Sequence, residues 1–206
     1  MTKVKYKAVV FDLFGTLTEH VTMPQYHGML IKMAAALSIN PDVFIKLWTE
    51  TSEDRIKGII NNYQENIEHI CRQAGIPLEY KNIDFATRIR FDMIRSELVP
   101  RKDAEKVISL LKTDGYKLGL ISDCTHEAAI AWENTVFPAL FDAVVFSCQV
   151  GVEKPDARIY QLAMDKLDVR PEDCVYIGDG GSQELSGASR VGMYAVLLGV
   201  LDRSIN

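Results

Sequence analysis

The sequence contains few cysteines and no excess of positive charge. Its four cysteines form no C-x-x-C pair, so their spacing indicates neither a zinc site nor a redox motif. We therefore expect reduced thiols, as in a cytoplasmic protein. The formal net charge is −5, whereas proteins that bind nucleic acid usually carry a basic surface. Nucleic acid is accordingly not an expected partner.

Long hydrophobic runs are also missing. No stretch reaches about 18 uncharged apolar residues, the length that a membrane-spanning helix needs. The first residues, MTKVKY, lack the apolar region of a signal peptide. We expect a cytoplasmic protein with no membrane partner. With 206 residues, of which 48% are hydrophobic and 25% charged, the chain can form one sizeable core, or a core with a small insertion.

Five short apolar segments have the composition of buried strands. Near-continuous apolar runs, such as AVVF at 143–146, are typical of parallel strands that are covered on both faces. The last four segments alternate with helical patterns, which indicates βαβ units and an α/β fold. The predicted strands are 7–12, 117–122, 143–147, 174–178 and 194–198.

The residues between the first two predicted strands show no strand-like alternation. Apolar residues recur there at helical spacing, as at Leu30, Met33 and Leu37. An all-helical block in this place is typical of an inserted cap and not of a part of the sheet. The predicted helices are 24–38, 41–59, 62–74 and 84–98.

Polar side chains follow four of the predicted strands at their carboxyl ends. In an open parallel sheet these ends meet at one edge, where such folds hold their ligands. Each cluster alone is commonly a helix cap, a loop or a solvated group, but four in chain order at one edge are much less expected by chance. The clusters are Asp12; Ser122 with Asp123; Glu153 with Lys154; and Gly178 with Asp179, followed by Glu184.

Such a set of side chains can carry out a specific kind of chemistry. A carboxylate can attack an electrophilic centre and form a covalent ester or acyl phosphate. Further carboxylates can hold Mg²⁺, which binds a few carboxylate oxygens together with water and phosphate oxygens. A lysine and a hydroxyl can offset and orient charge on a transferred group. Gly180 and Gly181 would let the backbone approach closely.

The order of these motifs resembles that of the haloacid dehalogenase (HAD) superfamily, in its members with a helical cap. The family's first motif, D-x-D-x-T-L, is similar to DLFGTL at 12–17. Its second motif, a Ser or Thr that ends the next strand, matches Ser122, and its lysine in a K-P-D setting matches Lys154. GDGGSQELSGASRVGM at 178–193 keeps the register of the fourth motif. The resemblance covers almost the whole chain.

The resemblance implies a Rossmann-like parallel sheet with the strand order 5-4-1-2-3. The α/β core would consist of residues 1–17 and 99–206, and the α-helical cap of residues 18–98. A small phosphorylated metabolite would be the substrate, and Mg²⁺ would be the cofactor. We expect a monomer or a homodimer.

The resemblance also implies roles for individual residues. Asp12 would be the nucleophile and a metal ligand, and Phe14 would offer its backbone carbonyl to the metal. Asp179 would be a further ligand. Glu184, which stands in the place of an aspartate, would bind the metal through water or orient Lys154.

The remaining motif residues would contact the substrate. Ser122 would donate a hydrogen bond to the phosphoryl group, and Lys154 would neutralise its charge. Gly15, Thr16 and Asp123 would line the substrate-binding site.

Position 14 departs from the pattern of the family's phosphatases. In these enzymes the second aspartate of the first motif protonates the leaving group and activates water, and Phe14 can do neither. General acid–base catalysis contributes roughly 10²–10⁴-fold, so its loss predicts a slow phosphatase unless another group substitutes. The candidate substitutes in nearby loops are Asp123, Glu19, His20 and His126.

Two other functions stay open from the sequence. An aromatic residue at position 14 resembles the D-x-Y-G-T-L pattern of 2-haloacid dehalogenases, in which a halide leaves without a proton and no metal is used. Without a metal, however, the carboxylates of Asp179 and Glu184 would repel Asp12, which favours a metal-dependent phosphatase. Alternatively, the chain could be a binding or regulatory protein that has lost catalysis together with the acid.

Overall fold

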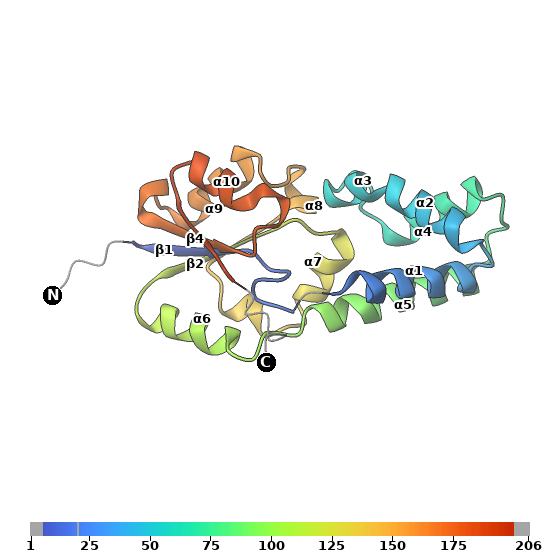
Figure 1. Cartoon of the computed structure of the whole chain (residues 1–206), viewed down its shortest axis with the longest axis horizontal. Coiled ribbons are helices and arrows are strands. Elements are labelled where there is room, and N and C mark those ends of the chain that lie inside the picture. The colour runs from blue at the N-terminus through green and yellow to red at the C-terminus, as the bar shows by residue number, and fades with distance from the viewer. Residues whose placement is uncertain (1–5, 20, 200–206) are drawn as a thin grey trace.

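The computed structural model describes residues 6–19 and 21–199, in which strands alternate with helices outside one helical block (Figure 1). The strands are β1 (Ala8–Phe11), β2 (Lys117–Ser122), β3 (Ala143–Phe146), β4 (Cys174–Gly178) and β5 (Tyr194–Leu197). The helices of the block are α1 (Met23–Ala36), α2 (Pro41–Glu50), α3 (Ser52–Ile56), α4 (Tyr63–Gln73) and α5 (Tyr80–Glu97). The other helices are α6 (Ala104–Thr113), α7 (His126–Trp132), α8 (Ser147–Val150), α9 (Ala157–Leu167) and α10 (Glu184–Arg190). Three 3-10 turns are η1 (Phe137–Ala139), η2 (Pro171–Asp173) and η3 (Gly181–Gln183).

The five strands form one parallel sheet in the order β3-β2-β1-β4-β5. β1 lies at its centre, where Phe11 is paired with Leu120 of β2 and with Ile177 of β4. This order is the predicted 5-4-1-2-3 counted from the opposite edge, and every strand ends within one residue of its predicted limits. The predicted α/β fold is therefore confirmed.

The central strand explains why apolar runs mark the strands of this chain. All four residues of β1 are buried. Val9 and Phe11 belong to the core on one face of the sheet, and Ala8 and Val10 to the core on the other. Because successive side chains of a strand point to opposite faces, a strand between two helical layers needs a continuous apolar run.

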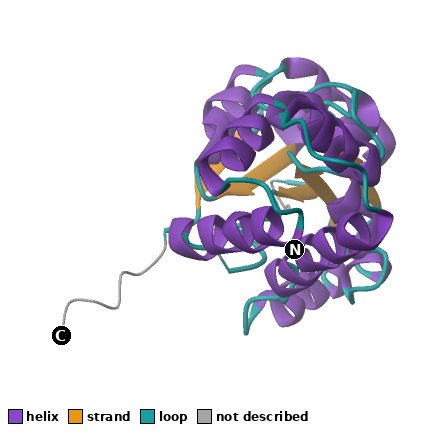
Figure 2. Cartoon of the chain, turned by 90° about the vertical axis from the view of Figure 1, so that its right-hand side faces the viewer, coloured by secondary structure: helices purple, strands orange, loops and turns teal. Residues whose placement is uncertain are grey.

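Helices cover both faces of the sheet and give three layers (Figures 1 and 2). On one face α6 and α7 contribute Ile108 and Trp132 to the core. On the other face α9 and α10 contribute Met164 and Ala188. In Figure 1, β1 runs toward the helices α1 to α5, so the carboxyl edge of the sheet faces the helical block.

The helical block has an apolar core of its own, built around Met33, Phe44, Trp48, Ile67 and Ile70. Its helices α1 and α5 lie side by side (Figure 1). The chain enters and leaves the block at adjacent points, since Thr18 and Pro100 form an antiparallel bridge. This arrangement is in keeping with an inserted cap, and the exact boundaries at 17/18 and 98/99 stay a prediction.

The predicted helix 41–59 is wrong, because the structure has two helices that break at Thr51. The carbonyl oxygen of Trp48 accepts hydrogen bonds from the Thr51 hydroxyl at 3.1 Å and from Arg55 Nη1 at 2.9 Å. These two side chains occupy the carbonyl oxygen that would accept the next backbone hydrogen bond of a continuous helix. The chain then turns at Gly58, whose φ of +69° lies in the left-handed region that glycine adopts without strain.

The last helix of the block also differs from its prediction at one end. α5 begins at Tyr80 and not at 84. Tyr80 is exposed, and Ile83 is the first buried residue of α5. The apolar spacing that marks a helix in the sequence therefore begins only after its first turn.

Two expectations drawn from composition can be compared with the structure. All four cysteines are buried and free, as expected for reduced thiols. Among the described residues no single helix combines the length and the apolar composition that crossing a bilayer requires, and only α1 and α2 taken together, bent by 113°, meet both.

The aromatic packing beneath the sheet provides a test of the fold. Phe137 is fully buried and stacks on Trp132 with ring centroids 5.0 Å apart, whereas its neighbour Val136 is 46% exposed. We expect Phe137→Ala to lower the free energy of unfolding by about 3–5 kcal/mol, because it leaves a cavity. Val136→Ala is the matched control and should change this free energy by less than about 0.5 kcal/mol. Equal effects of the two substitutions in urea denaturation would contradict the described packing.

Candidate active site

Asp12 directly follows the central strand and is 4% exposed. Its backbone N–H donates to the Ile177 carbonyl at 2.9 Å, which holds the residue against β4. Its Oδ2 accepts a hydrogen bond from the Thr16 hydroxyl at 2.9 Å. Gly15, with a φ of +82°, allows the tight turn that brings Thr16 back toward Asp12. The loop after β1 therefore fixes one buried carboxylate at the carboxyl edge of the sheet.

Lys154 lies at the centre of the polar cluster and is 5% exposed. Its Nζ donates to Asp12 Oδ1 at 2.6 Å and to Glu184 Oε2 at 2.6 Å. Burial by itself lowers the pKa of this ammonium, but the negative charges of Asp12 and Glu184 outweigh burial and raise the pKa above its usual value. Lys154 is therefore charged, and it ties together two loops of the sheet edge.

Glu184 opens α10 and is completely buried. Besides Lys154, its Oε2 accepts from the Tyr176 hydroxyl at 2.8 Å, and its Oε1 accepts from the Gly180 N–H at 3.0 Å. Gly178 makes room for it, because a Cβ at that position would lie 2.0 Å from Glu184 Oε1. Burial raises the pKa of Glu184, and the charge of Lys154 partly offsets this effect.

Three carboxylates converge beside this lysine. One ligand atom from each of Asp12, Asp179 and Glu184 lies within 4.8 Å of the other two. Asp179 is half-buried, and its Oδ1 accepts from the Gly181 N–H at 2.9 Å. Carboxylates that lie this close together repel one another unless positive charge is placed among them. The donor set, all oxygen, fits a hard cation such as Mg²⁺.

Two further predicted residues lie at the end of β2. Ser122 is buried, and its Oγ has no hydrogen-bond partner within the protein. Asp123 Oδ1 accepts from the Lys154 backbone N–H at 3.0 Å. Burial raises the pKa of Asp123, against the opposing effect of Lys154. Because buried hydroxyls are usually satisfied, the unpartnered Ser122 Oγ is typical of a group whose partner is a ligand.

Phe14 is half-buried and packs against the core on the α6 side of the sheet. Of the four residues that could substitute for an acid at position 14, Asp123 lines the same small cavity as Phe14. Glu19 instead reaches Arg101 at 3.6 Å beside a different cavity. His126 begins α7. His20 lies outside the described residues.

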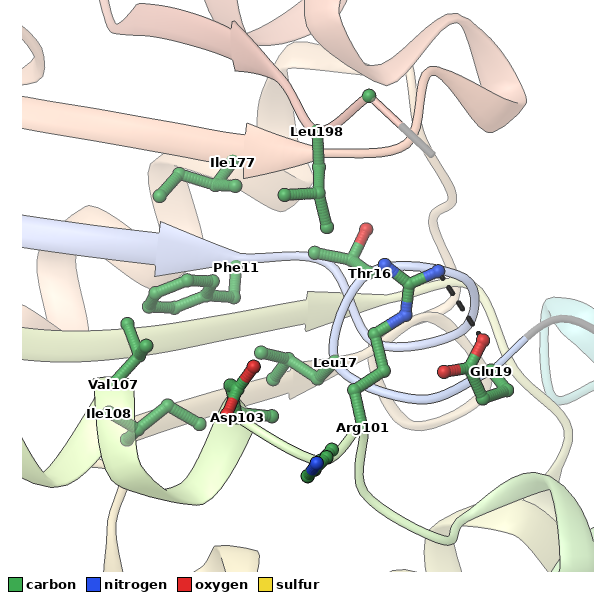
Figure 3. A pocket seen from close by; sticks show the side chains of 13 residues that line it. Phe11, Thr16, Leu17, Glu19, Arg101, Asp103, Val107, Ile108, Ile177 and Leu198 are labelled. Atoms are coloured by element: carbon green, nitrogen blue, oxygen red, sulfur yellow. Dashed lines mark ion pairs between the residues drawn. The ribbon is translucent and has the colours of Figure 1, made fainter. Parts of the chain in front are cut away.

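Two cavities flank the polar cluster. The larger one, of about 860 Å³, lies beside Thr16, and in Figure 3 apolar side chains of β1, β4 and α6 line it. In the same view the side chain of Arg101 extends toward Glu19. The smaller cavity, of about 200 Å³, lies between the cap helices and the loops after β1 and β2. Neither Asp12 nor Lys154 lines the larger cavity. The greater volume of this cavity therefore does not identify it as the active site.

The sequence-predicted residues Asp12, Ser122, Asp123, Lys154, Asp179 and Glu184 thus share one edge of the sheet, and Thr16 and Gly15 shape its first loop. Sequence reasoning missed Tyr176, which looks like any apolar strand residue until Glu184 is placed against it. It also missed two buried arginines, Arg55 and Arg90. Arg90 occupies the apolar face of α5, in line with Ile83 and Ile94, and this misplaced charge is the signal that could have revealed it.

Known proteins are similar to this chain in sequence and in fold. The family model of haloacid dehalogenase-like hydrolases matches residues 6–192. The glyceraldehyde 3-phosphate phosphatase of Methanopyrus kandleri is 29% identical over 201 residues, which cover 92% of this chain and 82% of that protein. The (S)-2-haloacid dehalogenase 4A of Burkholderia cepacia is 22% identical over 195 residues, which cover 92% of this chain and 81% of that protein.

A solved structure agrees at the level of the fold. A HAD family enzyme of Bacteroides thetaiotaomicron, crystallised with magnesium and inorganic phosphate, superposes with a TM-score of 0.72 at 17% identity. The match covers 97% of this chain and 98% of that one. Because the family model spans nearly the whole described sheet and its helical insertion, this chain belongs to the haloacid dehalogenase-like hydrolases.

Proposed function

We propose that this chain is a Mg²⁺-dependent hydrolase of a small phosphomonoester that works through an aspartyl phosphate on Asp12. The observation that carries the proposal is the convergence of three carboxylates at the sheet edge. Asp12, Asp179 and Glu184 each offer an oxygen within 4.8 Å of the other two, and a divalent cation prefers such an all-oxygen set. Lys154 binds Asp12 and Glu184 and lies beside the place where a phosphoryl group would bind. The similarity to a glyceraldehyde 3-phosphate phosphatase supports a phosphate ester as the substrate class.

In the first step, an Asp12 oxygen forms a bond to phosphorus while the bond from phosphorus to the ester oxygen breaks. Each Asp12 oxygen accepts one hydrogen bond within the protein, which leaves lone pairs for the attack. Lys154 offsets charge on the phosphoryl oxygens, and the unpartnered Ser122 hydroxyl donates to one of them. In the second step, water attacks the aspartyl phosphate, which releases inorganic phosphate and restores the Asp12 carboxylate.

The metal would be held by Asp12, Asp179 and Glu184 together with the backbone carbonyl of Phe14. A bound Mg²⁺ would supply positive charge that polarises the phosphoryl oxygens. Gly180 and Gly181 serve this site through their N–H groups, which fix the carboxylates of Glu184 and Asp179. Glu184 has the additional role of orienting Lys154.

The leaving oxygen needs a proton that Phe14 cannot supply. Asp123 is the acid best placed to replace it, because it shares a cavity with Phe14 and because burial raises its pKa, which favours the protonated form. After giving its proton to the leaving group, the same carboxylate would accept a proton from the attacking water. Gly15 and Thr16 position the nucleophile for both steps.

A second candidate function, 2-haloacid dehalogenation, is favoured by one observation, the aromatic side chain at position 14. A halide leaves without a proton, so this reaction needs no acid there. The convergence of Asp179 and Glu184 on Asp12 argues against a metal-free site. Release of halide from 2-haloacids in the presence of EDTA would favour this second function over the first.

The nucleophile is tested by Asp12→Asn. We expect the wild type to release phosphate from a small phosphomonoester with Mg²⁺ and to lose this activity with EDTA. Asp12→Asn should lower kcat at least about 1,000-fold, because an amide cannot form the intermediate. Asp114→Asn, on an exposed residue after α6, is the matched control and should keep full activity. Phosphate release by Asp12→Asn at the wild-type rate would contradict the proposal, and a wild type inactive on a broad ester panel would favour a binding protein.

The missing acid is tested by Phe14→Asp. A carboxyl group at this position should raise kcat, by at most about 10²–10⁴-fold, because it can protonate the leaving group. Phe14→Asn has the same size without the acid and should give no such gain. If Phe14→Asp is no faster than Phe14→Asn, then proton transfer from position 14 is not limiting. Loss of activity in Asp123→Asn would in that case identify the acid in use.

A further inference from the structure

Two of the four cysteines follow neighbouring strands at the carboxyl edge of the sheet. The last paired residues of β2 and β3 are Ser122 and Phe146. Cys124 and Cys148 each come two residues after this pair. Neighbouring strands lie about 4.8 Å apart, and a disulfide joins residues whose Cα atoms are about 4.4–6.8 Å apart. The register of the sheet therefore brings these two cysteines, which are distant in sequence, within the reach of a disulfide.

A serine holds the two residues together beyond the ends of their strands. Ser147, which directly precedes Cys148, accepts a hydrogen bond on its Oγ from the Cys124 N–H at 3.0 Å. The Ser147 hydroxyl donates in turn to the Ile56 carbonyl of the cap at 2.8 Å. The loop after β2, the start of α8 and the end of α3 thus meet at one side chain, which fixes the place of both cysteines.

The two thiols face each other and share a hydrogen bond. The hydrogen bond from the Cys124 thiol lowers the pKa of Cys148. Burial instead raises the pKa of Cys124, as it does for Cys71 and Cys174. Among the four cysteines, all of which lie in the described part of the chain, Cys148 is therefore the one whose surroundings favour the thiolate. The thiolate is the form that reacts with oxidants.

Packing alone explains why these cysteines are buried but not why they are paired. Both belong to the apolar core on the α6 side of the sheet, and a buried cysteine commonly serves as a small apolar residue. Cys71 and Cys174 fill that role singly, each in a different core. Two thiols in contact are instead the arrangement of a redox pair, in which one sulfur is oxidised and the other resolves it.

A cavity leads to this pair. Cys124 lines the smaller cavity, which has a volume of about 200 Å³. A water molecule takes up about 30 Å³ in the liquid, so a molecule as small as hydrogen peroxide fits into this space. Cys124 is 4% and Cys148 7% exposed, which excludes bulky oxidants such as a protein or peptide disulfide. The oxidant class that suits the pair is therefore a small hydroperoxide.

From these observations we propose that Cys124 and Cys148 form a redox-active dithiol, which hydrogen peroxide converts to a disulfide. The Cys148 thiolate attacks one peroxide oxygen, the O–O bond breaks, and hydroxide leaves with the electron pair, which gives a sulfenic acid. The Cys124 sulfur then attacks the sulfenic sulfur, and the S–O bond breaks as the second hydroxide leaves. The two thiol protons convert both hydroxides to water, so two thiols are oxidised and one peroxide is reduced.

The disulfide would also change the active site beside it, a consequence that rests on the proposed function. Asp123 directly precedes Cys124, and its Oδ1 accepts from the Lys154 N–H at 3.0 Å. An S–S bond of about 2.0 Å is shorter than a hydrogen bond between two sulfur atoms, so its formation draws the loops after β2 and β3 together. A displacement of about 1 Å at a reacting group can cost about 100-fold. We expect oxidation to lower kcat about 10- to 100-fold.

The test is a disulfide map of the folded wild type before and after treatment with hydrogen peroxide, with alkylation of free thiols in denaturant. Trypsin leaves both cysteines on one peptide, because no lysine or arginine lies between 117 and 154, but a glutamate-specific protease cuts between them at Glu127 and Glu133. We expect the four free thiols to fall to two, and the two cysteine fragments to stay joined until dithiothreitol is added. Cys148→Ala should form no such link. Cys71→Ala, in the core of the cap, is the matched control and should form it.

Activity is measured in parallel on p-nitrophenyl phosphate with Mg²⁺. The wild type and Cys71→Ala should lose activity with peroxide and regain it with dithiothreitol, which does not restore oxidised methionine, whereas Cys148→Ala should keep its activity throughout.

Four free thiols after peroxide, or a loss of thiols without a link between Cys124 and Cys148, would overturn the dithiol. The expected link without a loss of activity keeps the dithiol and rejects its effect on the site. Because the map needs no substrate, it decides on the dithiol even where p-nitrophenyl phosphate is not hydrolysed, and that result counts against the proposed function alone.

Discussion

The ion pairs of Lys154 with Asp12 and Glu184 are the interaction on which the rest of the site depends. They join the loops that follow β1, β3 and β4, three strands that are distant in sequence. All three side chains are almost fully buried, so removing Lys154 would leave two buried carboxylates without their counter-charge. Asp179 brings a third carboxylate oxygen within 4.8 Å of those of Asp12 and Glu184, and this convergence of oxygen ligands is the physical reason to expect a cation.

The fold serves this cluster in several ways. A parallel sheet brings the carboxyl ends of its strands to one edge, and the hydroxyl of Tyr176 and the backbone of Gly180 hold Glu184 in place from that edge. Gly178 supplies the space that its side chain needs. On the opposite side of the cavity, the cap contributes Arg55 and Arg90. We propose that the core carries the groups for phosphoryl transfer and that the cap carries the groups that select the substrate.

Much of this arrangement could be predicted from the sequence, because apolar runs and strand-end carboxylates are local signals. The sheet order and the convergence of Asp12, Lys154 and Glu184 follow from them once the family resemblance is noted. The break of the cap helix at Thr51 could not be predicted, since it depends on side chains that compete for one carbonyl oxygen. The burial of Arg55 could not be predicted either, because only the tertiary packing of the cap onto the sheet edge creates its cavity.

The most direct test of the account is the effect of Mg²⁺ on the melting temperature, at constant ionic strength. A cation bound by the folded state at 100 times its Kd adds about 2.7 kcal/mol of stability, or about 5–10 °C for a chain of this size. We predict this increase for the wild type and for Asp114→Asn, and its loss in Asp179→Asn. A wild type that Mg²⁺ does not stabilise, or an Asp179→Asn variant stabilised to the same extent, would contradict the claim that these carboxylates form a cation site.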